Sequence, residues 1–249
     1  MSQQQQQQQQ RGPVPAPGAE PMQLTRACPA CSTPTYAMAL LTRFPGWDRD
    51  VAATRHQCHA CNHVSTRYTV GVAPTHTQGQ RTVLHVRHPR DLDRDVLKSE
   101  HAVLAVPALG LQLPGATMAG TLCSVRELLA FVRGDVAGNY ARAMGEAAEN
   151  GGEDQEAQLA ALGAFLDKLT RVLSLEATGD EDQVEKDWFV ADGVVAADSP
   201  LTIEISDPAG NSYIAPMGDD VALDTARTIE DFERTAEMVA MLEELLAVE

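Results

Sequence analysis

Two short cysteine motifs, CPAC at residues 28–31 and CHAC at residues 58–61, decide how the N-terminal part of this chain folds. Two residues between paired cysteines let one tight turn aim both sulfur atoms at the same ion. Four thiolates at tetrahedral corners are typical of a zinc site, and they leave no open position for water or substrate. We therefore predict one structural Zn²⁺, whose ligands are Cys28, Cys31, Cys58 and Cys61.

The residues between the motifs favour a zinc ribbon over a redox site. A redox dithiol uses one CxxC motif, whereas here two copies flank a predicted strand pair. Tyr36, Met38 and Leu40 alternate as one face of a strand, and FPGW at residues 44–47 is typical of a turn. The sequence therefore predicts a zinc ribbon over residues 23–75.

Other residues near the motifs have simpler interpretations. Asn62 follows the fourth cysteine, where a positive φ is often needed, and Asn tolerates that conformation. His59 and His63 are expected to be exposed, because four thiolates already fill the coordination shell. Cys123 stands alone beside a predicted helix start, and we interpret it as an inert buried thiol.

The N-terminal segment has no apolar face to bury. Residues 3–10 are eight consecutive Gln, and residues 11–21 read RGPVPAPGAEP. Such composition is typical of disorder. We predict a disordered tail over residues 1–22.

Downstream of the ribbon, the pattern predicts a β-rich domain over residues 76–228 with a helical insertion at about 124–180. Pro107 interrupts the apolar run at residues 102–113, which favours two short strands joined by a bend. Alternating or apolar runs predict further strands at 81–88, 187–196, 200–206 and 212–214.

Helical periodicity appears in three places. Ser124 and Glu127 form a capping box for a helix expected over residues 124–134. Leucines at three- and four-residue spacing predict an amphipathic helix over residues 154–176, whose apolar stripe we assign to the core, with a coiled coil as the alternative. A C-terminal amphipathic helix is predicted over residues 229–249.

One turn is a candidate partner-binding loop. Asp, Pro, Gly and Asn together are a strong turn signal, and a plain hairpin turn would explain them. It would not explain the aromatic residue at the exit of the turn, where an aromatic side chain can anchor a partner. The candidate residues are Asp207, Pro208, Gly210, Asn211, Ser212 and Tyr213.

Charge is distributed unevenly along a chain whose net charge is −16. Residues 1–150 carry 14 Lys and Arg against 11 Asp and Glu, whereas residues 151–249 carry 5 against 24. The acidic half would repel phosphate, so nucleic acid is disfavoured and a basic protein partner is favoured. A solvated surface that keeps the protein soluble is the alternative.

Several function classes find no support in the sequence. No apolar run approaches the ~20 residues of a membrane span, and no secretory signal pattern is present, so we predict no membrane association and a cytoplasmic or nuclear location. The sequence contains no GxSxG elbow, phosphate-binding Gly-rich loop or HExxH motif. We therefore predict that the chain is not an enzyme.

Taken in order, these segments resemble the ZPR zinc-finger family. The resemblance spans residues 25–245 and rests on CPAC and CHAC, DLDRDVLKSEHAVLAVPAL, ISDPAGNSYIAP and FERTAE. It implies a mostly β fold with a helical insertion (α+β): a zinc ribbon followed by a double-stranded β-helix-like domain with an inserted helical hairpin and a C-terminal helix. The chain departs from the usual family residues at Asn62, Ala108, Arg126 and Glu127.

The resemblance also implies a protein partner. Eukaryotic members have two tandem modules and look after translation elongation factor 1-alpha, and this single module is most similar to their C-terminal one. We therefore predict a binding factor or chaperone for elongation factor 1-alpha or a related translational GTPase. A nucleic-acid-binding zinc ribbon and a divergent scaffold that has lost the family partner remain as alternatives.

Overall fold

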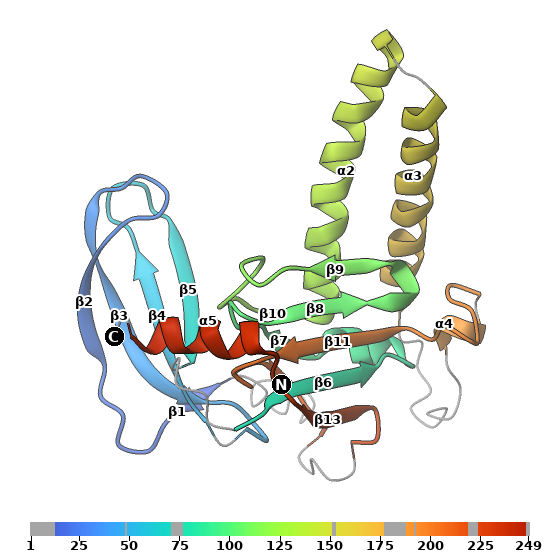
Figure 1. Cartoon of the computed structure of the whole chain (residues 1–249). Coiled ribbons are helices and arrows are strands. Elements are labelled where there is room, and N and C mark those ends of the chain that lie inside the picture. Colours follow the sequence, from blue (N-terminus) through green and yellow to red (C-terminus); the bar gives the residue numbers. More distant parts are fainter. Residues whose placement is uncertain are drawn as a thin grey trace, which may run out of the picture.

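The computed structural model describes residues 13–47, 49–70, 77–150, 153–176, 188–191, 193–218 and 224–247. Three antiparallel sheets and a projecting pair of helices make up these parts (Figure 1). The predicted class, mostly β with a helical insertion, is confirmed. Among the described helices, none combines the length and the apolar character needed to cross a lipid bilayer.

The N-terminal sheet carries both cysteine motifs. Its central strands run in the order β3, β4, β5, while β1 and β2 both pair with β3. Along β3, Thr35 and Ala37 are buried, whereas Tyr36 and Met38 point outward, so the predicted alternation is present. The strands are β1 (Val14–Pro15), β2 (Met22–Ala27), β3 (Pro34–Arg43), β4 (Asp50–Gln57) and β5 (Val64–Val70).

Part of the predicted disordered tail is folded in the structure. Val14 and Pro15 pair with Arg43 and Thr42 at the end of β3. The next residue, Ala16, is buried, and its amide donates to the Leu41 carbonyl at 2.9 Å. The ten-residue strand β3 extends past the end of β2, so its last residues have a free edge with which Val14 and Pro15 can pair. Proline is tolerated in such an edge strand. Residues 1–12, including the Gln run, lie outside the described residues.

The second body consists of two facing antiparallel sheets. The five-stranded sheet has the order β13-β6-β11-β8-β9, and the three-stranded sheet has the order β10-β7-β12. The large sheet contains β6 (Gly79–His85), β8 (Val103–Val106), β9 (Leu111–Leu113), β11 (Thr202–Asp207) and β13 (Arg227–Phe232). The small sheet contains β7 (Asp95–Leu97), β10 (Leu122–Ser124) and β12 (Tyr213–Ile214). The bend predicted at Pro107 is the short 3₁₀ helix η2 (Pro107–Leu109), and η1 (Pro89–Asp93) precedes β7.

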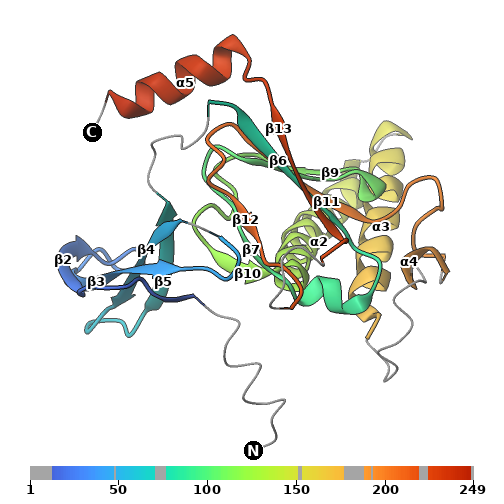
Figure 2. The same cartoon turned by 90° about the horizontal axis from the view of Figure 1, so that it is seen from below.

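The helical insertion is a hairpin of α2 (Val125–Asn150) and α3 (Glu153–Ser174) that projects from the sheets (Figures 1 and 2). The predicted capping box is confirmed: the Ser124 amide donates to Glu127 Oε2 at 2.8 Å, and the Glu127 amide donates to Ser124 Oγ at 3.1 Å. α3 matches its predicted span. The end predicted for α2 at residue 134 is wrong, because the helix continues past Gly134 to Asn150 and packs along α3.

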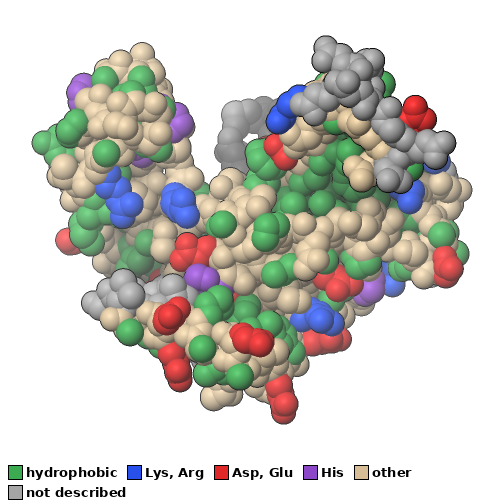
Figure 3. Space-filling view, turned by 45° about the horizontal axis from the view of Figure 1, so that its top comes forward, with side chains coloured by type: hydrophobic (Ala, Val, Ile, Leu, Met, Phe, Trp, Pro, Cys, Tyr) green, Lys and Arg blue, Asp and Glu red, His purple; other side chains and the backbone are tan. Residues whose placement is uncertain are grey.

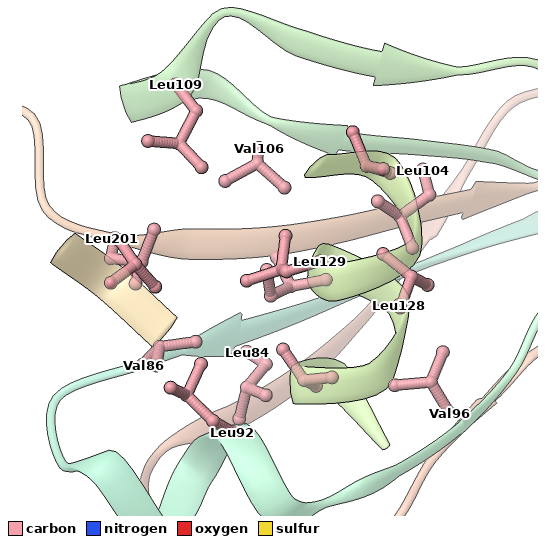
Figure 4. Close-up of a cluster of buried hydrophobic side chains, with 14 of the residues drawn as sticks. Leu84, Val86, Leu92, Val96, Leu104, Val106, Leu109, Leu128, Leu129 and Leu201 are labelled. Carbon is pink, nitrogen blue, oxygen red and sulfur yellow. The ribbon is translucent and has the colours of Figure 1, made fainter. Parts of the chain in front are cut away.

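The core of this body lies between the two sheets and is closed by the first turns of α2 (Figure 4). Leu84, Leu104 and Val106 come from the large sheet, and Leu128 and Leu129 from α2 complete the cluster. All are at most 2% exposed. Burial of aliphatic side chains is therefore what joins the helical hairpin to the sheets.

Two other predicted elements differ in the structure. Within the predicted strand at 187–196, the chain forms the short helix α4 (Trp188–Ala191), which buries Phe189. The predicted C-terminal helix begins late, since residues 227–232 pair with β6 as strand β13 and α5 spans Ala236–Leu246. The free edge of β6 provides hydrogen-bond partners for the backbone of residues 227–232. This pairing outweighs the helical spacing of their side chains.

Candidate metal centre

The two cysteine motifs fold into matching turns. The amides of Ser32 and Asn62 donate to the carbonyls of Cys28 and Cys58 at 2.8 Å and 3.0 Å. The amides of these two cysteines in turn donate to the carbonyls of Thr33 and His63, each at 2.9 Å.

Each turn ends in a left-handed residue, with φ of 60° at Ser32 and 58° at Asn62. The prediction of a positive φ at Asn62 is confirmed. The positive φ of Ser32 was not predicted, although Ser32 directly follows the first motif as Asn62 directly follows the second.

The four sulfur atoms form a cluster of the right size for zinc. Their Sγ atoms all lie within 4.8 Å of one another. Cys28 Sγ is 3.7 Å from Cys61 Sγ, and Cys31 Sγ is 3.6 Å from Cys58 Sγ. A tetrahedral site with Zn–S bonds of ~2.3 Å requires sulfur atoms about 3.8 Å apart. The residues therefore fit one structural zinc ion.

The protein supports this cluster with hydrogen bonds. The amides of Ala30 and Ala60 donate to the sulfur atoms of Cys28 and Cys58, both at 3.4 Å. Cys31 Sγ lies 3.3 Å from the Thr33 hydroxyl. This hydroxyl, followed by the Thr33 amide, lowers the pKa of Cys31 to about 6, which favours the thiolate that binds metal.

The histidines beside the motifs and the fifth cysteine do not belong to this cluster. Within the described residues, the four cysteines alone form a group able to hold a metal ion, and neither His59 nor His63 belongs to it. Burial raises the pKa of Cys123 to about 11, which agrees with its interpretation as an unreactive thiol.

An aromatic cluster connects the ribbon to the second body. Phe44 and Trp47, from the turn after β3, contact Tyr213 of β12 with ring centroids 5.2 Å and 5.1 Å apart. Tyr68 of β5 lies 5.7 Å from Phe44. The Tyr213 hydroxyl donates to the Pro45 carbonyl at 2.8 Å. The metal-binding sheet and the second body are therefore held together by packed rings.

The candidate partner-binding turn is buried. Asp207 accepts hydrogen bonds from the amides of Ala209 and Asn211, each at 2.9 Å, and from the Ser212 hydroxyl at 2.6 Å. Gly210 has the positive φ expected of the hairpin interpretation, at 67°. In this structure the turn has a structural role and offers a partner little surface, since all six candidate residues, Asp207, Pro208, Gly210, Asn211, Ser212 and Tyr213, are buried.

Sequence reasoning missed a buried ionic cluster. The Arg94 side chain is only 3% exposed. It forms salt bridges with Asp91 at 2.9 Å and with Asp224 at 2.5 Å. No sequence signal links Arg94 to Asp224, because 130 residues separate them.

Comparison with known proteins places these features in a family. The family model described as the ZPR1 jelly-roll domain matches residues 90–244. The chain belongs to the ZPR1 family. The matched residues hold the helical hairpin and every strand of the two facing sheets except β6, which confirms the expected double-stranded β-helix-like domain.

Relatives from several eukaryotes cover most of this chain. It is 26% identical over 88% of its length to the Drosophila melanogaster protein "Zinc finger protein ZPR1" and, over the same share, 26% identical to its Homo sapiens counterpart. The match covers 41% and 42% of those proteins, so the chain spans about two fifths of their length. The Schizosaccharomyces pombe protein "Zinc finger chaperone zpr1" is 33% identical over 45% of this chain and 24% of its own length.

Proposed function

We propose that this chain is a zinc-stabilised protein-binding module that serves as a chaperone or binding factor for elongation factor 1-alpha or a related translational GTPase. The observation that carries the proposal is membership of a family in which one relative is named a zinc finger chaperone. The closed four-thiolate cluster supports a structural rather than a catalytic role for zinc.

The exposed surface supports protein binding. Tyr36, Met38 and Val64 of the ribbon are 62%, 45% and 51% exposed, and Phe131 and Met144 on α2 are 53% and 46% exposed. Exposed aromatic and methionine side chains are common in protein interfaces. The ribbon and the helical hairpin form separate lobes in Figure 3, so a partner can reach both.

The nucleic-acid alternative is the weaker candidate. Arg26, Arg55 and Arg67 on the ribbon are exposed, whereas Arg49 is only 8% exposed. Residues 151–249, with 5 Lys and Arg against 24 Asp and Glu, would repel a phosphate backbone. We therefore propose a protein partner in the cytoplasm or nucleus.

Co-purification tests the proposal. The tagged chain is used to capture proteins from a nuclease-treated lysate, and bound proteins are identified by mass spectrometry. We expect an elongation factor 1-alpha homologue, captured by the wild type and lost with Cys58→Ser, while Cys123→Ser serves as the cysteine control. Material retained only without nuclease would contradict a protein partner. Capture of unrelated proteins alone would favour a divergent scaffold.

A further inference from the structure

One face of the ribbon sheet is open and apolar, with a single cation near its centre. Tyr36 and Met38 of β3 share this face with Val64 of β5, and all three side chains are exposed. Arg55 of β4 lies directly opposite Met38 in the strand register, and Thr66 of β5 lies opposite Arg55. We call this surface the ribbon face, defined by Tyr36, Met38, Arg55, Val64 and Thr66.

The ribbon face contains no acidic side chain. Among the described strand residues of this sheet, those that alternation places on the same face as Arg55 include no Asp or Glu. Asp50, on the same strand, pairs with Arg43 on the opposite face. Arg55 itself is exposed and makes no ion pair or side-chain hydrogen bond within the described part of the chain. The surface is therefore complementary to an apolar partner surface that carries a carboxylate.

Helix α5 is apolar on two sides. Leu242 is 4% exposed, and Met238 and Met241 are half-buried, so one side of the helix already packs against the chain. On the other side, Val239 and Leu246 are 40% and 44% exposed. A helix that is apolar around most of its circumference is typical of a helix that is covered on all sides. The open side of α5 therefore has the character of a contact surface.

One carboxylate stands within this open side. Glu243 comes four residues after Val239 and three before Leu246, which places its exposed side chain between them. It makes no ion pair or side-chain hydrogen bond with any described residue. α5 contains three Glu and neither Lys nor Arg. We call Val239, Glu243 and Leu246 the outer stripe, which matches the ribbon face in apolar character and is opposite to it in charge.

The outer stripe and the ribbon face lie apart within one chain. In Figure 2, α5 stands at one side of the molecule, separated from the ribbon strands β2, β3 and β4. Both surfaces are therefore available to a second copy at the same time. If α5 of each copy packs on the ribbon face of the other, the two contacts are identical and the assembly closes as a two-fold dimer.

We propose that two copies of this chain form a dimer in which the outer stripe of each copy docks on the ribbon face of the other. Glu243 pairs with Arg55 at the centre of each contact, and the apolar side chains of the two surfaces pack around this pair. The dimer does not depend on the proposed elongation-factor partner. It covers the ribbon face and leaves the exposed side chains of α2 open to such a partner.

Charge reversal tests the dimer. In sedimentation experiments, the zinc-loaded full chain should have twice the mass of one chain at high concentration and the mass of one chain on dilution. Arg55→Glu and Glu243→Arg should each weaken dimerisation at least about 10-fold, because each places two like charges together in both contacts. Mixing the two variants should restore a dimer, since each contact then again joins one carboxylate with one guanidinium group.

Two further reversals are matched controls. Arg67 follows Thr66 on β5 and therefore lies on the opposite face of the sheet. Glu244 is turned about 100° from Glu243 around the helix axis. Both residues are exposed, and Arg67→Glu or Glu244→Arg should change the dissociation constant by no more than about twofold. Melting temperature and zinc content verify that each variant is folded.

Several results would overturn the dimer. They are a wild type that keeps the mass of one chain, reversal variants that dimerise as tightly as wild type, control variants that weaken the dimer equally, or a mixture of reversal variants that does not associate. Elongation-factor capture is a separate measurement. Its failure would leave the dimer in place, and a monomeric chain would leave the proposed partner in place.

Discussion

At the scale of single residues, Arg94 joins segments that are distant in sequence. It contacts Asp91 of η1 and both carboxylate oxygens of Asp224, and it donates to the Ala215 carbonyl at 3.2 Å. A buried cation is costly unless it is paired and hydrogen-bonded, and here it is both. Asp224, just before β13, is therefore tied through Arg94 to Asp91 and to the Ala215 carbonyl.

Breaking this pair should destabilise the fold in a pH-dependent way. Burial raises the pKa of Asp224, but hydrogen bonds from Arg94 and its charge outweigh this and leave the pKa below its usual ~3.9. A depressed carboxyl pKa contributes stability above the unfolded value, and this stability is lost as pH falls through the folded value. Asp224→Asn should lower the free energy of unfolding by ~3–5 kcal/mol at pH 7. The variant should also lose less stability than the wild type when the pH falls below about 4, because it has no carboxylate to protonate at this position.

Urea unfolding at pH 7, 4 and 3 measures this effect. Asp50→Asn is the matched control, because its ion pair with Arg43 is exposed to solvent and should contribute little to stability. Equal losses for the two variants would contradict a special role for the buried pair.

Tyr213 is expected to act through packing. Tyr213→Ala should lower stability by ~3–5 kcal/mol, because it removes a 3% exposed ring from the aromatic cluster. Tyr213→Phe should lose only ~1 kcal/mol with the hydrogen bond to Pro45. Chemical unfolding of both variants measures the difference. Unchanged stability of Tyr213→Ala with weakened partner capture would restore the interface interpretation.

At the scale of elements, the helical hairpin is anchored at its base. On α3, Leu169 is fully buried in the core, whereas Leu162 is half-buried farther out. Leu169→Ala should cost ~2–5 kcal/mol and Leu162→Ala clearly less, as measured by chemical unfolding. If Leu162→Ala keeps its stability and loses partner binding, the outer part of the stripe is an interface.

Local signals predicted the elements that depend on short-range interactions. The Ser124–Glu127 box and the spacing of the α3 leucines are interactions within a few residues, so the sequence shows them directly. The far half of α2 has no apolar stripe, and its helix is supported by α3. The assignment of residues 227–232 to a strand depends on the distant edge of β6, which no local pattern can show.

For the candidate site, too, local features could be predicted and long-range contacts could not. Spacing alone identified the four zinc ligands, because each turn aims its own two sulfur atoms. The burial of Asp207 and Tyr213 was not predictable, because the ribbon turn that covers Tyr213 lies about 168 residues earlier in the chain.

At the scale of the whole molecule, the two bodies differ in what stabilises them. The second body has a large aliphatic core, whereas the ribbon contributes Phe44 and Val51 to a small cluster shared with Leu97 and Tyr213. So small a core cannot stabilise a sheet by itself, and structural zinc supplies an apparent ~10–16 kcal/mol in comparable units. Folding of the ribbon should therefore depend on bound zinc, whereas folding of the second body should not.

Metal removal tests this difference. Elemental analysis of purified protein should give about one zinc per chain, and less than about half would contradict the site. Chelation, or Cys58→Ser, should make residues 22–70 sensitive to protease and should change Trp47 emission, while the second body keeps a cooperative melting transition. Cys123→Ser, outside the cluster, should retain zinc.

Because the ligands must be deprotonated, lowering the pH should release the ion by protonating the thiolates. Raising the pH again with zinc present should restore the ribbon. Loss of both bodies in one step would instead mean that the aromatic junction couples them too tightly to unfold separately.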